Sequence, residues 1–296
     1  MNYYHKEITK MKRMIIRVFK PFIERFPLIA MFYRVLRDNI QYSSEPIETT
    51  MGFKFIGSST IQLGKFEPEE TEVFKSIINN VDILVNVGAN IGYYCCLALV
   101  RNKYVIAFEP INLNVKHLLR NIKANNWEDR IEVYPIALSN KKSGAIEIYG
   151  GGTGASLIRG WAGTPVNYVN LVPISTLDNV IGNRLKNKRS FIVVDIEGAE
   201  KYMLEGATSV LEMTPKPIWM MEITVSEHQP KGVKINPNLL STFQLFWERG
   251  YIARTANIEN RVVLSDELNQ IIKTGVDTLH THNFLFIEKE NDKLKL

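Results

Sequence analysis

Cysteine is scarce in this sequence, and this scarcity bears on the cellular compartment in which the protein acts. Two cysteines occur in 296 residues, Cys95 and Cys96, and they are adjacent. Adjacent cysteines form a mutual disulfide only with strain, so nothing in the sequence requires an oxidising compartment. We expect the protein to act in the cytoplasm.

The sequence also lacks a long apolar run and lacks positive charge in its main body. No stretch reaches the 18 or so apolar residues that a membrane-spanning helix needs. Residues 1–38 hold nine Lys or Arg against three Asp or Glu, whereas the remainder holds 27 against 28. A nucleic-acid-binding surface needs an excess of positive charge, so nucleic acid is a poor candidate partner.

The basic residues 1–40 have the pattern of an amphipathic helical arm. Apolar residues such as Ile16, Phe19 and Ile23 are interleaved with Lys and Arg at roughly helical spacing. Such a helix binds an anionic membrane or a partner protein, or simply packs on its own domain, and all three interpretations stay open. Lys20 and Arg25 interrupt the apolar stretch, so we do not expect a cleavable signal peptide.

The main domain is predicted at residues 81–290, where apolar runs alternate with helical patterns. This alternation indicates a doubly wound α/β fold with a mostly parallel sheet. Residues 41–80 are expected to form a hairpin, at 51–63, and a helix that cover the core, and 291–296 form a charged tail. The expected strands are 82–87, 104–109, 131–134, 191–195, 217–222 and 284–288.

The first predicted strand runs into a Gly-x-Asn-x-Gly turn at residues 88–92, which is the most informative segment. Gly88 and Gly92 permit tight backbone dihedral angles and leave space for a ligand, and the following helix offers free N–H groups. The Gly-x-Gly-x-x-Gly pattern of dinucleotide enzymes is lacking, which weighs against a nicotinamide-dependent oxidoreductase, kept here as a rival.

Two later positions extend this ligand site. Glu109 ends the second strand beside the glycine turn, where a carboxylate can accept both hydroxyls of a ribose; capping of the next helix is the alternative. Ala137 follows the third strand, within residues 135–139, whose small and apolar side chains suit one wall of an adenine site.

Acidic residues also end the later strands and are candidates for catalysis. Asp195 and Glu222 each close a strand, Glu197 follows Asp195 closely, and His228 lies in the loop beyond Glu222. A carboxylate or imidazole there is suited to act as a general base. For His228, an exposed loop histidine without a catalytic role is the equally open alternative. Asp195 and Glu222 are alternatively ligands for a hard cation such as Mg²⁺, although two oxygen ligands are too few to predict a metal site.

The Gly-rich stretch 150–154 is expected to lie over the ligand crevice. Ser156, Arg159 and Trp161 follow it and suit a polar or sugar-like substrate; a flexible hairpin tip is the equally open alternative.

Taken together, NVGANIGYY, AFEP, PIALSN, GGTGASL and especially VDIEGAE resemble the FkbM-type methyltransferases over about residues 81–254. The resemblance implies a Rossmann-like class I methyltransferase fold, S-adenosylmethionine as methyl donor, and O-methylation of a sugar, glycan or secondary metabolite. The residues assigned to the cofactor are Asn86, Gly88, Asn90, Gly92, Tyr93, Glu109 and Ala137. Those assigned to catalysis are Asp195, Glu222 and His228, and those assigned to the substrate are Ser156, Arg159 and Glu197.

The sequence departs from the family pattern at Asn86, where the family most often has an acid. Asparagine keeps a hydrogen-bond acceptor but loses the negative charge. This departure and the basic arm keep a second rival interpretation open: a non-catalytic binding protein that has the same fold.

Overall fold

The computed structural model of the chain describes residues 45–289. The predicted arm at residues 1–40 and the charged tail at 291–296 lie outside the described residues. Within the described part, no helix is long and apolar enough to cross a membrane.

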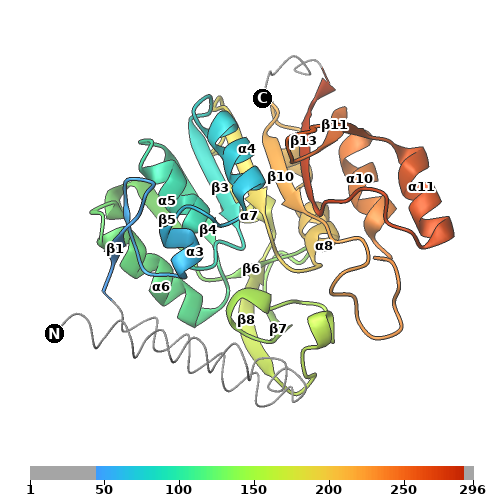
Figure 1. Cartoon of the computed structure of the whole chain (residues 1–296), viewed down its shortest axis with the longest axis horizontal. Coiled ribbons are helices and arrows are strands. Elements are labelled where there is room, and N and C mark those ends of the chain that lie inside the picture. Colours follow the sequence, from blue (N-terminus) through green and yellow to red (C-terminus); the bar gives the residue numbers. More distant parts are fainter. Residues whose placement is uncertain (1–44, 290–296) are drawn as a thin grey trace. The chain divides into compact units, whose positions relative to one another are not determined.

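The centre of residues 45–289 is an eight-stranded sheet with the order β12-β11-β13-β10-β9-β3-β4-β5 (Figure 1). Neighbours from β10 to β5 run parallel, and β13 is antiparallel to both β10 and β11. The predicted doubly wound, mostly parallel α/β fold is therefore confirmed. The strands are β3 (Ile83–Val87), β4 (Tyr104–Phe108), β5 (Ile131–Tyr134), β9 (Ser190–Val194), β10 (Ile218–Glu222), β11 (Tyr251–Thr255), β12 (Val262–Val263) and β13 (Asn283–Glu288).

Helices cover both faces of this sheet because successive side chains of a strand point to opposite faces. In β3, Leu84 packs with helices α4 to α6, whereas Val85 and Val87 pack with helices α7 to α11. The first group is α4 (Pro68–Ile78), α5 (Tyr93–Leu99) and α6 (Asn112–Lys123). The second is α7 (Leu177–Ile181), α8 (Glu200–Glu205), α9 (Thr208–Leu211), α10 (Leu239–Trp247) and α11 (Ser265–Thr274).

A smaller three-stranded sheet has the order β6-β8-β7 and lies beside the central sheet (Figure 1). Its strands are β6 (Ala137–Leu138), β7 (Ala145–Tyr149) and β8 (Val169–Ser175). Short 3₁₀ turns occur at Glu128–Arg130, Gly152–Gly154 and Trp161–Gly163. The long connection between β7 and β8 is the Gly-rich insertion that the sequence predicted to cover the crevice.

One local prediction was wrong. The expected hairpin at 51–63 begins earlier, because β1 (Ile47–Glu48) pairs with β2 (Lys54–Phe55), and the following residues form helix α3 (Ser59–Gln62). In α6, the buried stripe runs through Val115, Leu118 and Ile122, and Leu119 is 48% exposed.

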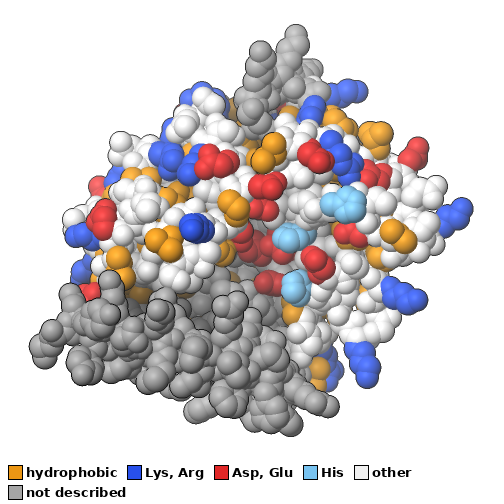
Figure 2. All heavy atoms as spheres, viewed as in Figure 1, with side chains coloured by type: hydrophobic (Ala, Val, Ile, Leu, Met, Phe, Trp, Pro, Cys, Tyr) orange, Lys and Arg blue, Asp and Glu red, His pale blue; other side chains and the backbone are white. Residues whose placement is uncertain are grey.

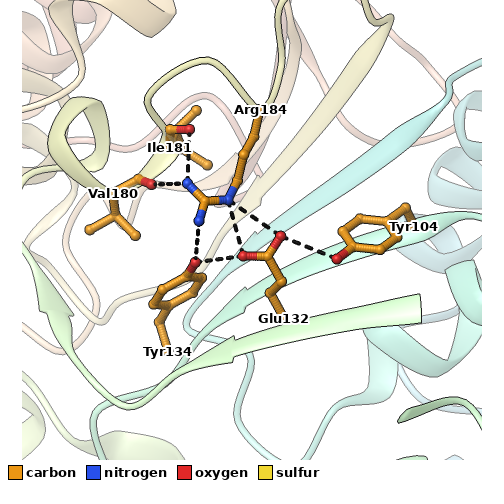
Figure 3. Close-up of polar contacts among 6 residues, drawn as sticks. All are labelled: Tyr104, Glu132, Tyr134, Val180, Ile181 and Arg184. Carbon is orange, nitrogen blue, oxygen red and sulfur yellow. Dashed lines mark hydrogen bonds and ion pairs between the residues drawn. The ribbon is translucent and has the colours of Figure 1, made fainter. Parts of the chain in front are cut away.

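A polar network ties α7 to the edge strand β5 (Figure 3). The guanidinium of Arg184, which follows α7, forms an ion pair with Glu132 at 3.0 Å and donates to the Tyr134 hydroxyl at 2.9 Å. Glu132 also accepts hydrogen bonds from Tyr104 and Tyr134. Burial favours a higher pKa for Glu132, but these hydrogen bonds and the charge of Arg184 together lower it.

Candidate functional site

A pocket lies at the carboxyl ends of β3, β4 and β9, the position at which open α/β sheets bind ligands. The space between its walls, including the part open to solvent, is about 590 Å³. Six residues that the sequence assigned to the cofactor or to the reaction line it: Gly88, Asn90, Glu109, Ala137, Asp195 and Glu197.

Gly88 begins the turn after β3 and is required for the approach of two strand ends. Its φ is +81°, and a Cβ atom added to it would lie 1.8 Å from the backbone oxygen of Asp195. The amide of Asp195 donates to the carbonyl of Val87 at 3.0 Å. Gly88 therefore lets β3 and β9 end side by side, a role that differs from the direct ligand clearance expected from the sequence.

Glu109 lies at the end of β4 and is 4% exposed. Its Oε2 accepts the Asn90 amide at 2.8 Å, and its Oε1 accepts the Ile111 amide at 2.9 Å and the Asn114 side chain at 3.1 Å. Burial raises the pKa of Glu109 to about 7, although these three hydrogen bonds act to lower it. A carboxylate has about four acceptor positions, so Glu109 retains room for one ribose hydroxyl rather than two.

One wall of the pocket is apolar. Phe108, Ile136, Ala137, Leu138 and Ile148 line it, and Ala137 and Leu138 are both less than a tenth exposed. Small and apolar side chains of this kind suit the flat face of an adenine.

Asp195 lines the pocket. Glu222 is not among the lining residues, but it lies at the position next to Asp195 on the neighbouring parallel strand, since Val194 of β9 pairs with Met221 of β10. Burial is the main cause that raises the pKa of both carboxyl groups. The charge of Glu197 raises both pKa values further, and the charge of Asp195 also raises that of Glu222. No residue in the range 45–289 forms a hydrogen bond or ion pair with either side chain. Figure 2 shows acidic side chains gathered in a hollow of the surface, with histidines beside them.

Glu197 lies in the turn after β9 with a left-handed φ of +56°. Its Oε2 accepts the indole N–H of Trp161 at 2.7 Å, and its backbone oxygen accepts the hydroxyl of Ser156. Burial raises the pKa of Glu197, whereas the hydrogen bond from Trp161 and the charges of nearby histidines act to lower it. Ser156 is 1% exposed and supports this turn instead of lining the pocket.

His228 and Arg159 lie outside the pocket lining. His228 is exposed, with φ +61°, and its ring centroid is 6.2 Å from that of Trp161. Arg159 is exposed on the Gly-rich insertion, near Tyr149. His228 thus stays close to the acidic hollow, while Arg159 lies away from it.

Three residues assigned to the cofactor do not line the pocket. Asn86 is 2% exposed and accepts a hydrogen bond from Cys95 of α5, on the opposite face of the sheet from Val87. A Cβ atom on Gly92 would meet Leu118 of α6. The Tyr93 hydroxyl lies 2.9 Å from the Thr71 hydroxyl. These residues pack the helices, so the assignments of Asn86, Gly92 and Tyr93 to cofactor contact find no support in the geometry.

Asn114 of α6 also belongs to the site, although it was not among the residues assigned to the site from the sequence. Its side-chain amide donates both to Glu109 Oε1 and to the backbone oxygen of Gly152, at 3.1 and 3.0 Å. It therefore links the carboxylate of the pocket to the Gly-rich insertion. Its place one turn beyond AFEP was the available signal, but the partner at Gly152 is 38 residues away in the chain.

The part of the chain that the structure describes contains no set of side chains that could bind a metal ion. No group of three or more His, Cys, Asp or Glu side chains there is arranged to hold one. Asp195 and Glu222 consequently have no third protein ligand that would complete a site.

The residues of the pocket fit S-adenosylmethionine. Glu109 has a free acceptor position, and the apolar wall around Ala137 suits an adenine. Asn90 also lines the pocket, and its Oδ1 is buried without a hydrogen-bond partner in residues 45–289. A buried orphan acceptor of this kind is stabilised when a ligand donates a hydrogen bond to it.

Residues 86–253, more than half of the chain, match the family model described as the methyltransferase FkbM domain. No curated protein matches the chain significantly.

The similar solved structures include three methyltransferases. A putative O-methyltransferase from Klebsiella pneumoniae has 9% identity and a TM-score of 0.42, over 93% of this chain and 97% of that one. An O-methyltransferase from Bacillus cereus, in complex with SAH, has 13% identity and a TM-score of 0.41, over 87% and 89%. A SAM-dependent methyltransferase from Agrobacterium tumefaciens has 12% identity and a TM-score of 0.40, over 82% and 69%.

Proposed function

This chain belongs to the methyltransferase FkbM family, and on that premise we propose that it methylates a hydroxyl oxygen of a sugar, a glycan or a small metabolite. The methyl donor of the family is S-adenosylmethionine. The observation that carries the proposal is one pocket lined both by the hydrogen-bonded Glu109, after β4, and by Asp195, after β9, on either side of β3. The Asp195 side chain has no hydrogen-bond partner among residues 45–289.

The donor's contacts are proposed from the fit of the pocket. Glu109 would accept a ribose hydroxyl, the wall around Ala137 would hold the adenine, and Asn90 Oδ1 would accept a further hydrogen bond. When bound, S-adenosylmethionine supplies an electrophilic methyl group on a sulfonium leaving group. The remaining work of the chain is to orient the acceptor and to remove one proton.

Asp195 is proposed as the general base. It lines the pocket and has no hydrogen-bond partner among residues 45–289, and its raised pKa makes its ionised form a stronger base than an exposed aspartate. The charge of Glu197 would raise the basicity of Asp195, and the charge of Asp195 in turn would raise the pKa of Glu222. Glu197 would contact the acceptor, and His228, which is exposed beside it, would remain a secondary candidate for proton transfer.

The test begins with calorimetric titration of the protein with S-adenosylmethionine, S-adenosylhomocysteine and NAD. Binding of the first two but not of NAD is expected, with loss of binding in Glu109→Ala and no loss in Glu147→Ala, which removes an exposed carboxyl group. Absence of binding to the methyl donor would favour the non-catalytic rival, and selective NAD binding would favour an oxidoreductase.

The acceptor is then found by incubating the protein and donor with neutral sugars, amino sugars, glycosides and phenols. Formation of S-adenosylhomocysteine identifies the acceptor, and NMR of the product distinguishes an O-methyl from an N-methyl group. Methylation of nitrogen alone would contradict the proposed chemistry.

The predicted arm at residues 1–40 lies outside the described residues, and we propose that it binds an anionic membrane surface from the cytoplasm. The support is its alternation of apolar and basic residues. Deletion of residues 1–38 should abolish co-sedimentation with phosphatidylserine vesicles. Equal sedimentation of both forms would contradict membrane binding, and capture of a partner protein without vesicles would favour the protein-binding alternative.

A further inference from the structure

The connection between β7 and β8 forms a strap, residues 150–164, over the pocket. Gly152, Thr153, Ala155 and Leu157 of the strap line the pocket. Near its beginning, the strap is held by the hydrogen bond from Asn114 to the Gly152 oxygen. Its other end contains Trp161, which the proposed mechanism does not use.

Trp161 is 2% exposed and packs against the turn that follows β9. A Cβ atom on Gly198 would lie 2.5 Å from the indole ring, so the glycine, with φ +94°, makes room for Trp161. Because the ring occupies this space, the packing of strap and turn depends on both residues.

The same end of the strap also contacts the loop that follows β10. The amide of Ala162 donates to the His228 oxygen at 2.7 Å, and the rings of Trp161 and His228 are 6.2 Å apart between centroids. Trp161 thus lies where the strap, the turn after β9 and the loop after β10 meet.

The junction of the strap, the turn after β9 and the loop after β10 constrains the conformation of Glu197. A left-handed φ is unfavourable for a residue with a side chain, so other contacts must hold Glu197 there. Ser156 donates to its backbone oxygen, and Trp161 donates to its Oε2. Oε1 has no hydrogen-bond partner among residues 45–289, and Glu197 lines the pocket, so one oxygen remains for a ligand.

We infer that Trp161 is a positioning residue for methyl transfer: its indole N–H holds Glu197 in the left-handed turn and fastens the strap as one wall of the pocket. The inference rests on the proposed function, because the wall matters for catalysis only if the pocket binds the methyl donor.

The decisive variant is Trp161→Phe, which keeps a ring against Gly198 but removes the N–H donor. Its matched control is Trp219→Phe, which removes a buried indole N–H that donates to the Tyr251 hydroxyl in the core. The loss of a hydrogen bond to a carboxylate typically weakens an equilibrium that depends on it, here ligand binding, by about tenfold or more. We therefore expect Trp161→Phe to bind S-adenosylhomocysteine about tenfold more weakly, and Trp219→Phe to bind it as the native chain does.

A second experiment tests the contact between Trp161 and Glu197 in the absence of a ligand, by the fluorescence of Trp161. The emission of Trp161, taken as the native spectrum minus that of Trp161→Phe, should change as Glu197 gains a proton on acidification, and Glu197→Gln should abolish the change. Asp195, Glu200, Glu222, His228 and His282 also lie near Glu197, so a change that persists in Glu197→Gln belongs to them and overturns the inference.

If Trp161→Phe does not fold, a second variant, Ser156→Ala, still tests the inference by amide hydrogen exchange. Ser156→Ala removes the other hydrogen bond to Glu197, and it should accelerate exchange at Ala162 and weaken S-adenosylhomocysteine binding in the same direction. Native-like exchange and binding in this variant would contradict the inference. Failure of the native chain to bind S-adenosylhomocysteine would overturn the proposed function together with this role, whereas binding that is insensitive to both variants would overturn this role alone.

Discussion

At the scale of single residues, Gly88 shows why a glycine in the turn after β3 is needed. Substitution Gly88→Ala places a side chain at φ +81° and drives its Cβ atom into the Asp195 backbone. The left-handed conformation alone costs roughly 1–2 kcal/mol, and the forced displacement adds about 1–3 kcal/mol. We expect a correspondingly large fall in the free energy of unfolding, measured by urea denaturation.

The matched control for this prediction is Gly52→Ala. Gly52 has φ +82° but no atom within 4 Å of the added Cβ position. The substitution Gly52→Ala therefore measures the free-energy cost of the left-handed backbone conformation without the cost of a steric clash. Equal destabilisation by the two substitutions would show that the approach of β3 to β9 is not what requires Gly88.

Asp195 and Glu197 allow a second prediction at this scale, because the charge of Glu197 raises the pKa of Asp195. If ionised Asp195 is the base, kcat falls as the pH is lowered through its raised pKa, and Asp195→Asn loses about 10²–10⁴-fold in kcat. Glu197→Gln removes the negative charge that, after burial, raises the pKa of Asp195 most, so the acid limb of the rate profile moves to lower pH.

The measurement is the pH dependence of kcat with the acceptor from the screen. An Asp195→Asn enzyme within threefold of the native rate would exclude Asp195 as the base. An acid limb that stays in place in Glu197→Gln would show that the charge of Glu197 does not act on Asp195.

At the scale of elements, the network around Arg184 holds α7 against the edge strand β5 (Figure 3). The pair Arg184–Glu132 is partly exposed, with side-chain exposures of 43% and 30%, so solvent weakens it. Arg184→Met is expected to destabilise the protein by only about 1 kcal/mol, which lowers Tm by about 2–3 °C in a chain of this size.

This loss should shrink at high salt, because salt screens exposed charges. Arg189→Met is the control, since Arg189 pairs with the more exposed Asp82 and lacks the tyrosine partners. A larger Tm change in Arg189→Met than in Arg184→Met would contradict the stabilising role of the network.

At the scale of the whole molecule, buried carboxyl groups make stability depend on pH. Burial raises the pKa of both Glu109 and Glu200 from 4.5 to about 7. The folded state then holds these protons more tightly than the unfolded state, so the free energy of unfolding falls as the pH rises from about 4.5 to 7 and levels off above that.

A rise in pKa of this size corresponds to roughly 3 kcal/mol for each group. We expect the ligand-free protein to be less stable at pH 8 than at pH 5 by a few kcal/mol, measured by urea denaturation at both values. Glu200→Gln should reduce this difference, with Glu147→Gln, at an exposed position, as the control. A native protein equally stable at both pH values would refute the prediction.

Much of the fold followed from local sequence patterns. Apolar runs such as 191–195 and the glycine turn at 88–92 predicted most strands of the central sheet and the end at which ligands bind. Strand β12 was missed because it has only two residues, and β11 was missed because it alternates between buried and partly buried residues, which gives a weaker pattern. Tyr251–Thr255 joins the rest of the central sheet through its antiparallel pairing with β13.

The sequence by itself determined the class of fold, the family, and the placement of Glu109 and Asp195 at strand ends, because periodicity and turn residues act over a few neighbouring positions. Only the tertiary structure decided that Asn86 faces Cys95 instead of the pocket, that Gly88 serves the approach of Asp195, and that Trp161 holds Glu197. Those pairings join residues far apart along the chain, and they depend on the order of the strands and on side-chain packing, which local periodicity does not encode.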